Sequence, residues 1–205
     1  LLMGPNASVI PCGGGSGRVD PIYSISLAEG MKGLGRNWSV SVADGKPSVK
    51  ELESASAVIV SVGFNSKTEK ENSDRTFSLP EGQDELIEYA AAHNRKVIVV
   101  IYAGGAVDMS RWKDKASAIV MGWYPGQEGG KAIANILAGK VNPSGKLTMT
   151  FPRSVGQIPI YYGYRPLGRP HKADDRFHRF PSSWLDSRTD PLYPFGYGLS
   201  YTSFE

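Results

Sequence analysis

The sequence predicts an α/β fold, a doubly wound and mostly parallel sheet with helices on both faces (an α/β sandwich). Three short runs rich in β-branched residues carry this prediction, at residues 57–63, 96–104 and 118–123. Each run reads as a fully buried strand, which is typical of parallel sheets covered on both faces. Amphipathic stretches alternate with the runs, as crossover helices do in repeated β-α units.

The two clearest crossover helices follow the first and third of these runs. Residues 80–94 place Pro80 in a first helical turn, where its missing N–H costs nothing. Residues 125–139 end at Gly139, which suits the left-handed position after a helix. The apolar faces expected for the two helices are Leu86, Ile87, Ala90 and Ala91 in the first and Ala132, Ile133, Ile136 and Leu137 in the second.

Weaker patterns extend the same organisation towards the N-terminus. Residues 24–35 and 46–55 are helical candidates that flank a predicted strand at 39–45. We therefore expect residues 1–152 to form the α/β sandwich core. Residues 153–205 are rich in Pro, Gly, Tyr and Arg without a sustained period, and we expect them to be a loop-rich extension that closes the same domain.

Composition limits the classes of function. The chain has 205 residues, enough for one globular domain, and its 23 Lys and Arg are scattered among 20 Asp and Glu. Neither nucleic acid nor a membrane surface is therefore a predicted partner, and the longest apolar runs fall short of the roughly 18 residues of a membrane span. Cys12 is the only cysteine, which excludes an intrachain disulfide. The opening LLMGPNAS reads as the end of a buried strand, so we expect the chain to begin within a longer protein.

The loop after residues 57–63 is the first candidate for a site, because open α/β sheets bind ligands beyond the carboxyl ends of their strands. It carries three carboxylates, Glu69, Glu71 and Asp74. One such group in a partly dry cleft can act as a general acid/base. Spacing alone favours the simpler interpretation of a solvated, charged loop.

Other motifs predict little chemistry of their own. Arg18 stands where both a dinucleotide-binding G-x-G-x-x-G and a G-x-S-x-G around Ser16 require glycine, so residues 13–17 remain only a flexible, substrate-facing loop. The histidines show no metal-ligand spacing; they are His93, His171 and His178. We therefore predict no metal and no cofactor.

Aromatic residues cluster late in the chain. They are Tyr161, Tyr162, Tyr164, Trp184, Tyr193, Phe195, Tyr197 and Tyr201. Sugar rings can stack on such side chains, but packing against another domain is their commoner use. We predict that part of this tract meets another domain or subunit.

Six motifs occur together along the chain. They are GPNA at 4–7, GGGSG at 13–17, TEKENSDRTFSLPEGQDELI at 68–87, GWYPGQEGG at 122–130, NPSGKLTMTFP at 142–152 and PLYPFGYGLSYTSF at 191–204. In this order they resemble the C-terminal domain of glycoside hydrolase family 3, which includes β-glucosidases and β-xylosidases. The resemblance covers nearly the whole chain.

The resemblance implies an active site shared between two domains. A preceding (β/α)8 barrel would bind the sugar and carry the nucleophilic Asp, and a Glu in the loop TEKENSDR would be the acid/base. Glu71 has the spacing of the family's G-E-G-x-D-R pattern, three residues before Asp74, whereas Glu69 fits members with T-E-x-x-G-D. Asn72 and Ser73 depart from the family's Gly followed by a larger residue, so the choice between the glutamates rests on counting.

The implied activity is retaining hydrolysis of terminal β-linked glucosyl or xylosyl units, with no cofactor. The partners would be the carbohydrate substrate and the barrel, in an extracellular or periplasmic location, and the isolated chain would be inactive. The alternative is a non-catalytic module that binds carbohydrate or packs against a partner.

Overall fold

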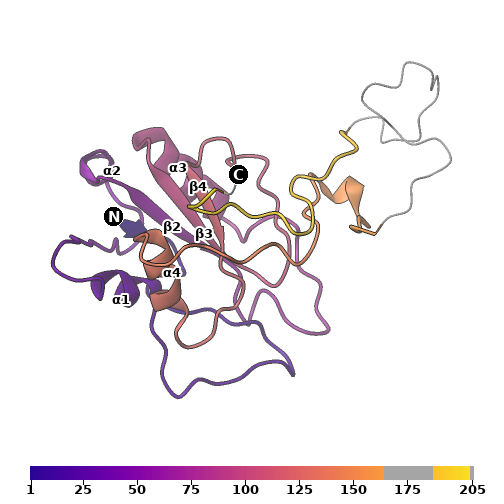
Figure 1. Ribbon diagram of the computed structural model, residues 1–205, viewed down its shortest axis with the longest axis horizontal. Coiled ribbons are helices and arrows are strands. Elements are labelled where there is room, and N and C mark those ends of the chain that lie inside the picture. The colour runs from indigo at the N-terminus through magenta and orange to yellow at the C-terminus, as the bar shows by residue number, and fades with distance from the viewer. Residues whose placement is uncertain (164–186, 204–205) are drawn as a thin grey trace. The chain divides into compact units, whose positions relative to one another are not determined.

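A computed structural model describes residues 1–163 and 187–203 (Figure 1). The chain forms two compact units, one of Leu1–Pro143 with the C-terminal residues from Tyr201, the other of Ser144–Ser200. The domain division expected at residue 152 stays a prediction. Within the described ranges no helix is both long enough and apolar enough to span a bilayer.

The first unit is built on a sheet of four parallel strands in the order β1-β2-β3-β4. Their bounds are Leu2–Met3, Val58–Gly63, Val97–Tyr102 and Ala118–Met121. Valine and isoleucine fill most of β2 and β3, and both strands are almost entirely buried, as predicted. β4 is only half-buried, so the prediction of full burial was wrong there. It pairs with β3 alone among the described strands, and an edge strand has less cover.

The strand predicted at residues 39–45 shrinks to a single parallel bridge between Val42 and Leu2. Two backbone hydrogen bonds hold it, from Leu2 N to Ser41 O at 2.8 Å and from Ala43 N to Leu2 O at 2.9 Å. Because β1 also pairs with β2, Val42 lies on the other side of β1. After β1 the chain runs to Val42 on one side of this strand, and it then crosses to β2 on the other side. This reversal is a topological switch point, where α/β sheets bind their ligands.

Two short helices accompany the reversal, α1 at Leu27–Lys32 and α2 at Val49–Ser54. Each opens with a capping box, which satisfies backbone N–H groups that a helix start leaves free. In α1, the Glu29 N–H donates to the Ser26 hydroxyl at 3.2 Å, while the Ser26 N–H donates to the Glu29 carboxylate at 2.8 Å. Both predicted helical candidates are confirmed.

The crossover helix α3 spans Gln83–His93. It begins after Gly82, whose φ is +80°, so the prediction of Pro80 in the first helical turn was wrong. Ile87 and Ala90 are buried, as the apolar spacing predicted.

The helix α4 spans Gly129–Leu137, and Gly139 follows it with φ +70°, the left-handed position that the sequence predicted. Ile133 and Ala134 are its buried apolar side chains. Ala132 is exposed, so its predicted place on the apolar face was wrong.

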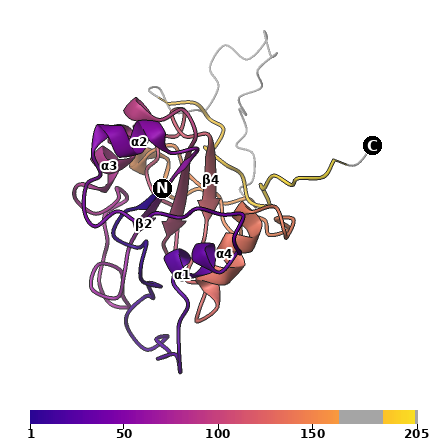
Figure 2. The same cartoon turned by 90° about the vertical axis from the view of Figure 1, so that its left-hand side faces the viewer.

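Helices cover both faces of the sheet (Figure 2). The core on one face joins α1 and α4 to strand side chains that include Leu2, Ile59, Val100 and Tyr102. On the other face α3 contacts β2 and β3, and α2 packs against α3. The predicted α/β sandwich is confirmed.

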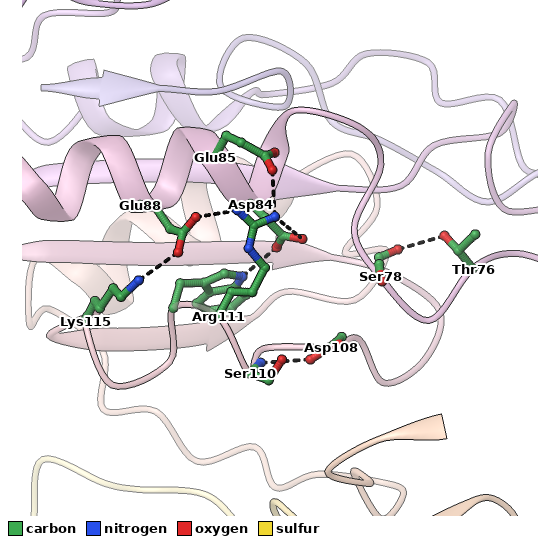
Figure 3. A network of polar contacts seen from close by, with 10 residues as sticks. Thr76, Ser78, Asp84, Glu85, Glu88, Asp108, Ser110, Arg111 and Lys115 are labelled. Carbon is green, nitrogen blue, oxygen red and sulfur yellow. Dashed lines mark hydrogen bonds and ion pairs between the residues drawn. The ribbon is translucent and has the colours of Figure 1, made fainter. Parts of the chain in front are cut away.

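An irregular segment connects β3 to β4 and is fastened to α3 (Figure 3). Trp112 is fully buried, and its indole N–H donates to Asp84 at 2.7 Å. The Arg111 guanidinium donates to Glu85 at 2.6 Å and to Glu88 at 2.5 Å. Burial raises the pKa of Asp84. These contacts stabilise a connection that, as described, contains no helix of its own.

The second unit is organised by Phe151 and Gln157, both buried. The Phe151 N–H donates to Tyr193 O at 2.8 Å, which joins the beginning of the unit to its end. Gln157 is the last residue of a 3-10 turn at Val155–Gln157, and its side-chain amide donates to Arg188 O at 2.7 Å. A buried side-chain amide thus closes the loop-rich unit.

The late aromatic residues are largely exposed where the structure describes them. Tyr161, Tyr162, Phe195 and Tyr197 are all exposed, and Tyr162 stacks on Phe195 with ring centroids 4.4 Å apart. Tyr164 and Trp184, also in the predicted cluster, lie outside the described residues. That this tract meets another domain stays a prediction.

Candidate functional site

Loops from the carboxyl ends of all four strands meet in one cluster. Gly14 follows β1, Glu69 lies six residues after β2, Gly104 two after β3 and Tyr124 three after β4. Parallel strands end at the same edge of a sheet, so these loops converge beside the switch point between β1 and β2.

Glu69 lies at the centre of this cluster, with its side chain 19% exposed. Its carboxylate accepts hydrogen bonds from Arg75 Nε at 2.5 Å, the Gly104 N–H at 2.7 Å and the Tyr124 hydroxyl at 2.5 Å. Burial acts to raise the pKa of Glu69, but the hydrogen bonds from Tyr124, Gly104 and Arg75 outweigh it and hold the pKa below its ordinary value. Burial and the nearby carboxylate raise the pKa of Tyr124.

Arg75 is itself held in place. Its guanidinium donates to Ala106 O at 2.9 Å and to Thr76 O at 3.0 Å, and it lies over the Phe64 ring, 4.6 Å from the centroid. Such a fixed, planar cation makes a well-defined partner for the Glu69 carboxylate.

We expect the Glu69 cluster to make stability depend on pH. A carboxyl whose folded-state pKa lies below its unfolded value stabilises the fold above that unfolded value, about 4.3 for Glu. This contribution is lost as the pH falls through the folded-state pKa, when the carboxylate takes up a proton. The difference in unfolding free energy between wild type and Glu69→Gln should therefore be larger at pH 7 than at pH 3. Urea unfolding at the two pH values measures it.

Glu53→Gln, which removes an exposed carboxylate on α2, is the matched control. A gap between wild type and Glu69→Gln that stays constant from pH 7 to pH 3 would contradict the expectation.

The glycine-rich loop pairs with the loop that carries the glutamates. The Gly14 N–H donates to Glu69 O at 3.0 Å, and the Glu71 N–H donates to Gly14 O at 3.4 Å. The Ser16 N–H then donates to the Glu71 carboxylate at 2.8 Å. The side chain and backbone of Ser16 lower the pKa of Glu71, which is otherwise exposed. The predicted flexible loop therefore has a specific partner.

Two backbone positions permit this pairing. Gly15 has φ +95°, and a Cβ there would lie 2.5 Å from the Cβ of Glu71, so only glycine fits. Asn72 has φ +58° in a tight turn closed by the bridge between Lys70 and Ser73. Asn is among the few residues besides Gly that adopt this left-handed conformation readily. Asn72 thus keeps the backbone form that a glycine at this position would supply.

The structure brings both predicted glutamates to the site, in different surroundings. Glu69 is anchored on three sides, whereas Glu71 is exposed. Sequence reasoning missed Gly104 and Tyr124, which follow the third and the fourth strand respectively. The strand-end rule that singled out the loop after β2 also applies to those two loops, and it was the available signal.

Metal ligands do not gather in the described part of the chain. No group of three or more His, Cys, Asp or Glu side chains suited to a metal occurs there. His93 ends α3 and meets the Tyr89 ring edge-on, with centroids 5.0 Å apart. His171 and His178 lie outside the described residues.

Comparison with known proteins gives consistent matches. The family described as "Glycosyl hydrolase family 3 C-terminal domain" matches residues 1–201. A periplasmic beta-glucosidase of Salmonella typhimurium is 41% identical over 157 residues, which cover 76% of this chain and 20% of that protein. A beta-xylosidase of Formosa agariphila is 35% identical over 200 residues, covering 90% of this chain and 26% of that protein.

Solved structures match over the full length of the chain. A beta-glucosidase from Listeria innocua in complex with isofagomine has a TM-score of 0.86 and 30% identity, over 100% of this chain and 30% of that one. The chain thus spans less than a third of the length of each of these relatives.

Proposed function

This chain belongs to the glycosyl hydrolase family 3 C-terminal domains, and we propose that it supplies the general acid/base to a retaining exo-β-glycosidase. The substrate would be a terminal β-linked glucosyl or xylosyl unit, since the relatives are named beta-glucosidases and beta-xylosidases. A (β/α)8 barrel of the same protein or a partner chain would bind the sugar and provide the nucleophilic Asp. The chain's own contribution would be Glu71.

The proposed reaction needs two carboxyl groups about 5 Å apart. The barrel's Asp attacks the anomeric carbon while Glu71 donates its proton to the departing glycosidic oxygen. The Glu71 carboxylate then takes a proton from water, which attacks the glycosyl-enzyme and releases the sugar with retained configuration.

One observation carries the choice of Glu71: its carboxylate is exposed at the switch point, directly before the left-handed turn at Asn72. Asn72 stands where the family's G-E-G-x-D-R pattern has glycine, and its φ of +58° supports aligning Glu71 with that Glu. Glu69 is the second candidate, but Arg75, Gly104 and Tyr124 already occupy its carboxylate. The exposed Glu71 carboxylate accepts one hydrogen bond, from the Ser16 N–H, and is free to meet a substrate oxygen.

We expect the isolated 205-residue chain to hydrolyse neither aryl β-glucosides nor aryl β-xylosides, because the nucleophile of the proposed site belongs to the barrel. Adding the separately produced barrel, or joining it to the chain, should restore turnover. The measurement is release of the phenol by each component and by the mixture. Turnover by the pure chain alone would refute the shared site.

The same experiment addresses the alternative, a module that binds carbohydrate or packs against a partner without chemistry. A barrel that is fully active alone would favour that alternative.

We also propose a periplasmic or extracellular location, since a relative with 41% identity is named a periplasmic beta-glucosidase.

A further inference from the structure

We propose that Glu69 is a positioning residue, whose anchored carboxylate fixes the backbone from which Glu71 projects. The inference rests on the proposed role of Glu71, and it gives the half-buried glutamate a task distinct from proton transfer. Three structural steps support it.

The first step is the anchor itself. The Glu69 carboxylate joins its own loop to the loops after β3 and β4, through the Gly104 N–H at 2.7 Å and the Tyr124 hydroxyl at 2.5 Å. Arg75 adds an ion pair at 2.5 Å, with both side chains less than a fifth exposed. A loop end tied to two other strand ends moves less than a free loop.

The second step leads from Glu69 to Glu71 along the backbone. Gly14 donates its N–H to Glu69 O at 3.0 Å, and its own carbonyl accepts the Glu71 N–H at 3.4 Å. The backbones of the two glutamates therefore share one partner residue, Gly14, and a shift of Glu69 displaces the residue that also holds Glu71. A displacement of about 1 Å at a reacting group can cost about 100-fold in rate.

The third step concerns charge. An unpaired carboxylate two residues from the acid would repel negative charge in the site. Arg75 neutralises Glu69, so the anchor adds no net charge beside Glu71. Glu69 can thus hold the loop without opposing the ionised form of Glu71.

The test is a double-mutant cycle in the full-length protein that joins this chain to its barrel. We expect Glu69→Gln to lower kcat on a substrate with a poor leaving group about 10- to 100-fold, with KM changed less than about threefold. In the Glu71→Ala background the same substitution should change kcat less than about twofold, because no acid remains to be positioned.

Tyr124→Phe is the second variant, since it removes one hydroxyl from the anchor and keeps the ring, should Glu69→Gln fail to fold. It should lower kcat about threefold to tenfold, again only when Glu71 is present. Tyr89→Phe, whose hydroxyl donates to Pro47 O instead, and Glu53→Gln are the matched controls and should leave kcat unchanged.

Three outcomes overturn the inference, and they differ from failure of the proposed function. Equal losses with and without Glu71 would show that Glu69 acts independently of it. Azide rescue of Glu69→Ala would make Glu69 the acid/base itself. Full activity of both Glu69→Gln and Tyr124→Phe would show that the anchor is dispensable. A fully active Glu71→Ala single variant would instead refute the proposed function.

Discussion

Glu71→Ala in the complete enzyme should lower kcat/KM about 100- to 10,000-fold on substrates with poor leaving groups, such as alkyl β-glucosides or disaccharides. Those substrates need a proton on the departing oxygen, whereas a dinitrophenolate leaves without one. The ratio of the wild-type kcat/KM to that of the variant should therefore fall towards one as the pKa of the leaving group falls. Kinetics with a series of aryl glycosides measures this dependence.

Azide should restore turnover of activated substrates by Glu71→Ala. With no general base left, the glycosyl-enzyme accumulates, and a small anion can attack it without deprotonation. The product should be a glycosyl azide with retained configuration. The same assay on Glu69→Ala decides between the two glutamates, and if neither variant shows rescue, the acid/base lies outside residues 68–75.

Gly130→Ala should lower the free energy of unfolding by about 3 kcal/mol, since an added methylene in a tight contact typically costs 1 to 3 kcal/mol and backbone clashes lie at the upper end. A Cβ on Gly130 would lie 2.1 Å from the Ser26 carbonyl oxygen, and one on Gly30 would lie 2.3 Å from the Gly130 carbonyl oxygen. Backbone contacts this close leave no flexible side chain to move aside. The first turn of α4 would have to separate from α1.

Urea unfolding of the chain measures this effect, and Gly17→Ala is the control because a Cβ there would meet nothing within 4 Å. The control should stay within about 0.5 kcal/mol of wild type. Equal stability of the two variants would show that α1 and α4 can separate at little cost.

Much of the fold could be predicted because its strongest signals are local. β2 and β3 consist mostly of valine and isoleucine, a composition typical of strands that are buried on both faces of a sheet. The strand expected at 39–45 failed for a non-local reason: β1 is only two residues long, so it offers Val42 a single bridge. The alternating pattern was present, but β1 is too short to pair with all of it.

The site was predictable in position and not in roles. The strand-end rule located Glu69 and Glu71 in one loop. Their different surroundings depend on Tyr124, 55 residues from Glu69, and on Ser16, 55 residues from Glu71. No local pattern reports contacts over such separations. Counting within the loop therefore favoured Glu71 by its spacing to Asp74 but kept Glu69 as the alternative.

The glycine contact between α1 and α4 also constrains how the chain folds. Gly30 and Gly130 are 100 residues apart in the sequence, and a six-residue helix such as α1 is too short to persist alone in water. At a synthesis rate of about 5 to 20 residues per second, α1 waits roughly 5 to 20 s for its partner to leave the ribosome. During that interval Leu27 and Met31, both buried in the folded chain, have no α4 to cover them. The first helix of the domain is thus among its last parts to become stable.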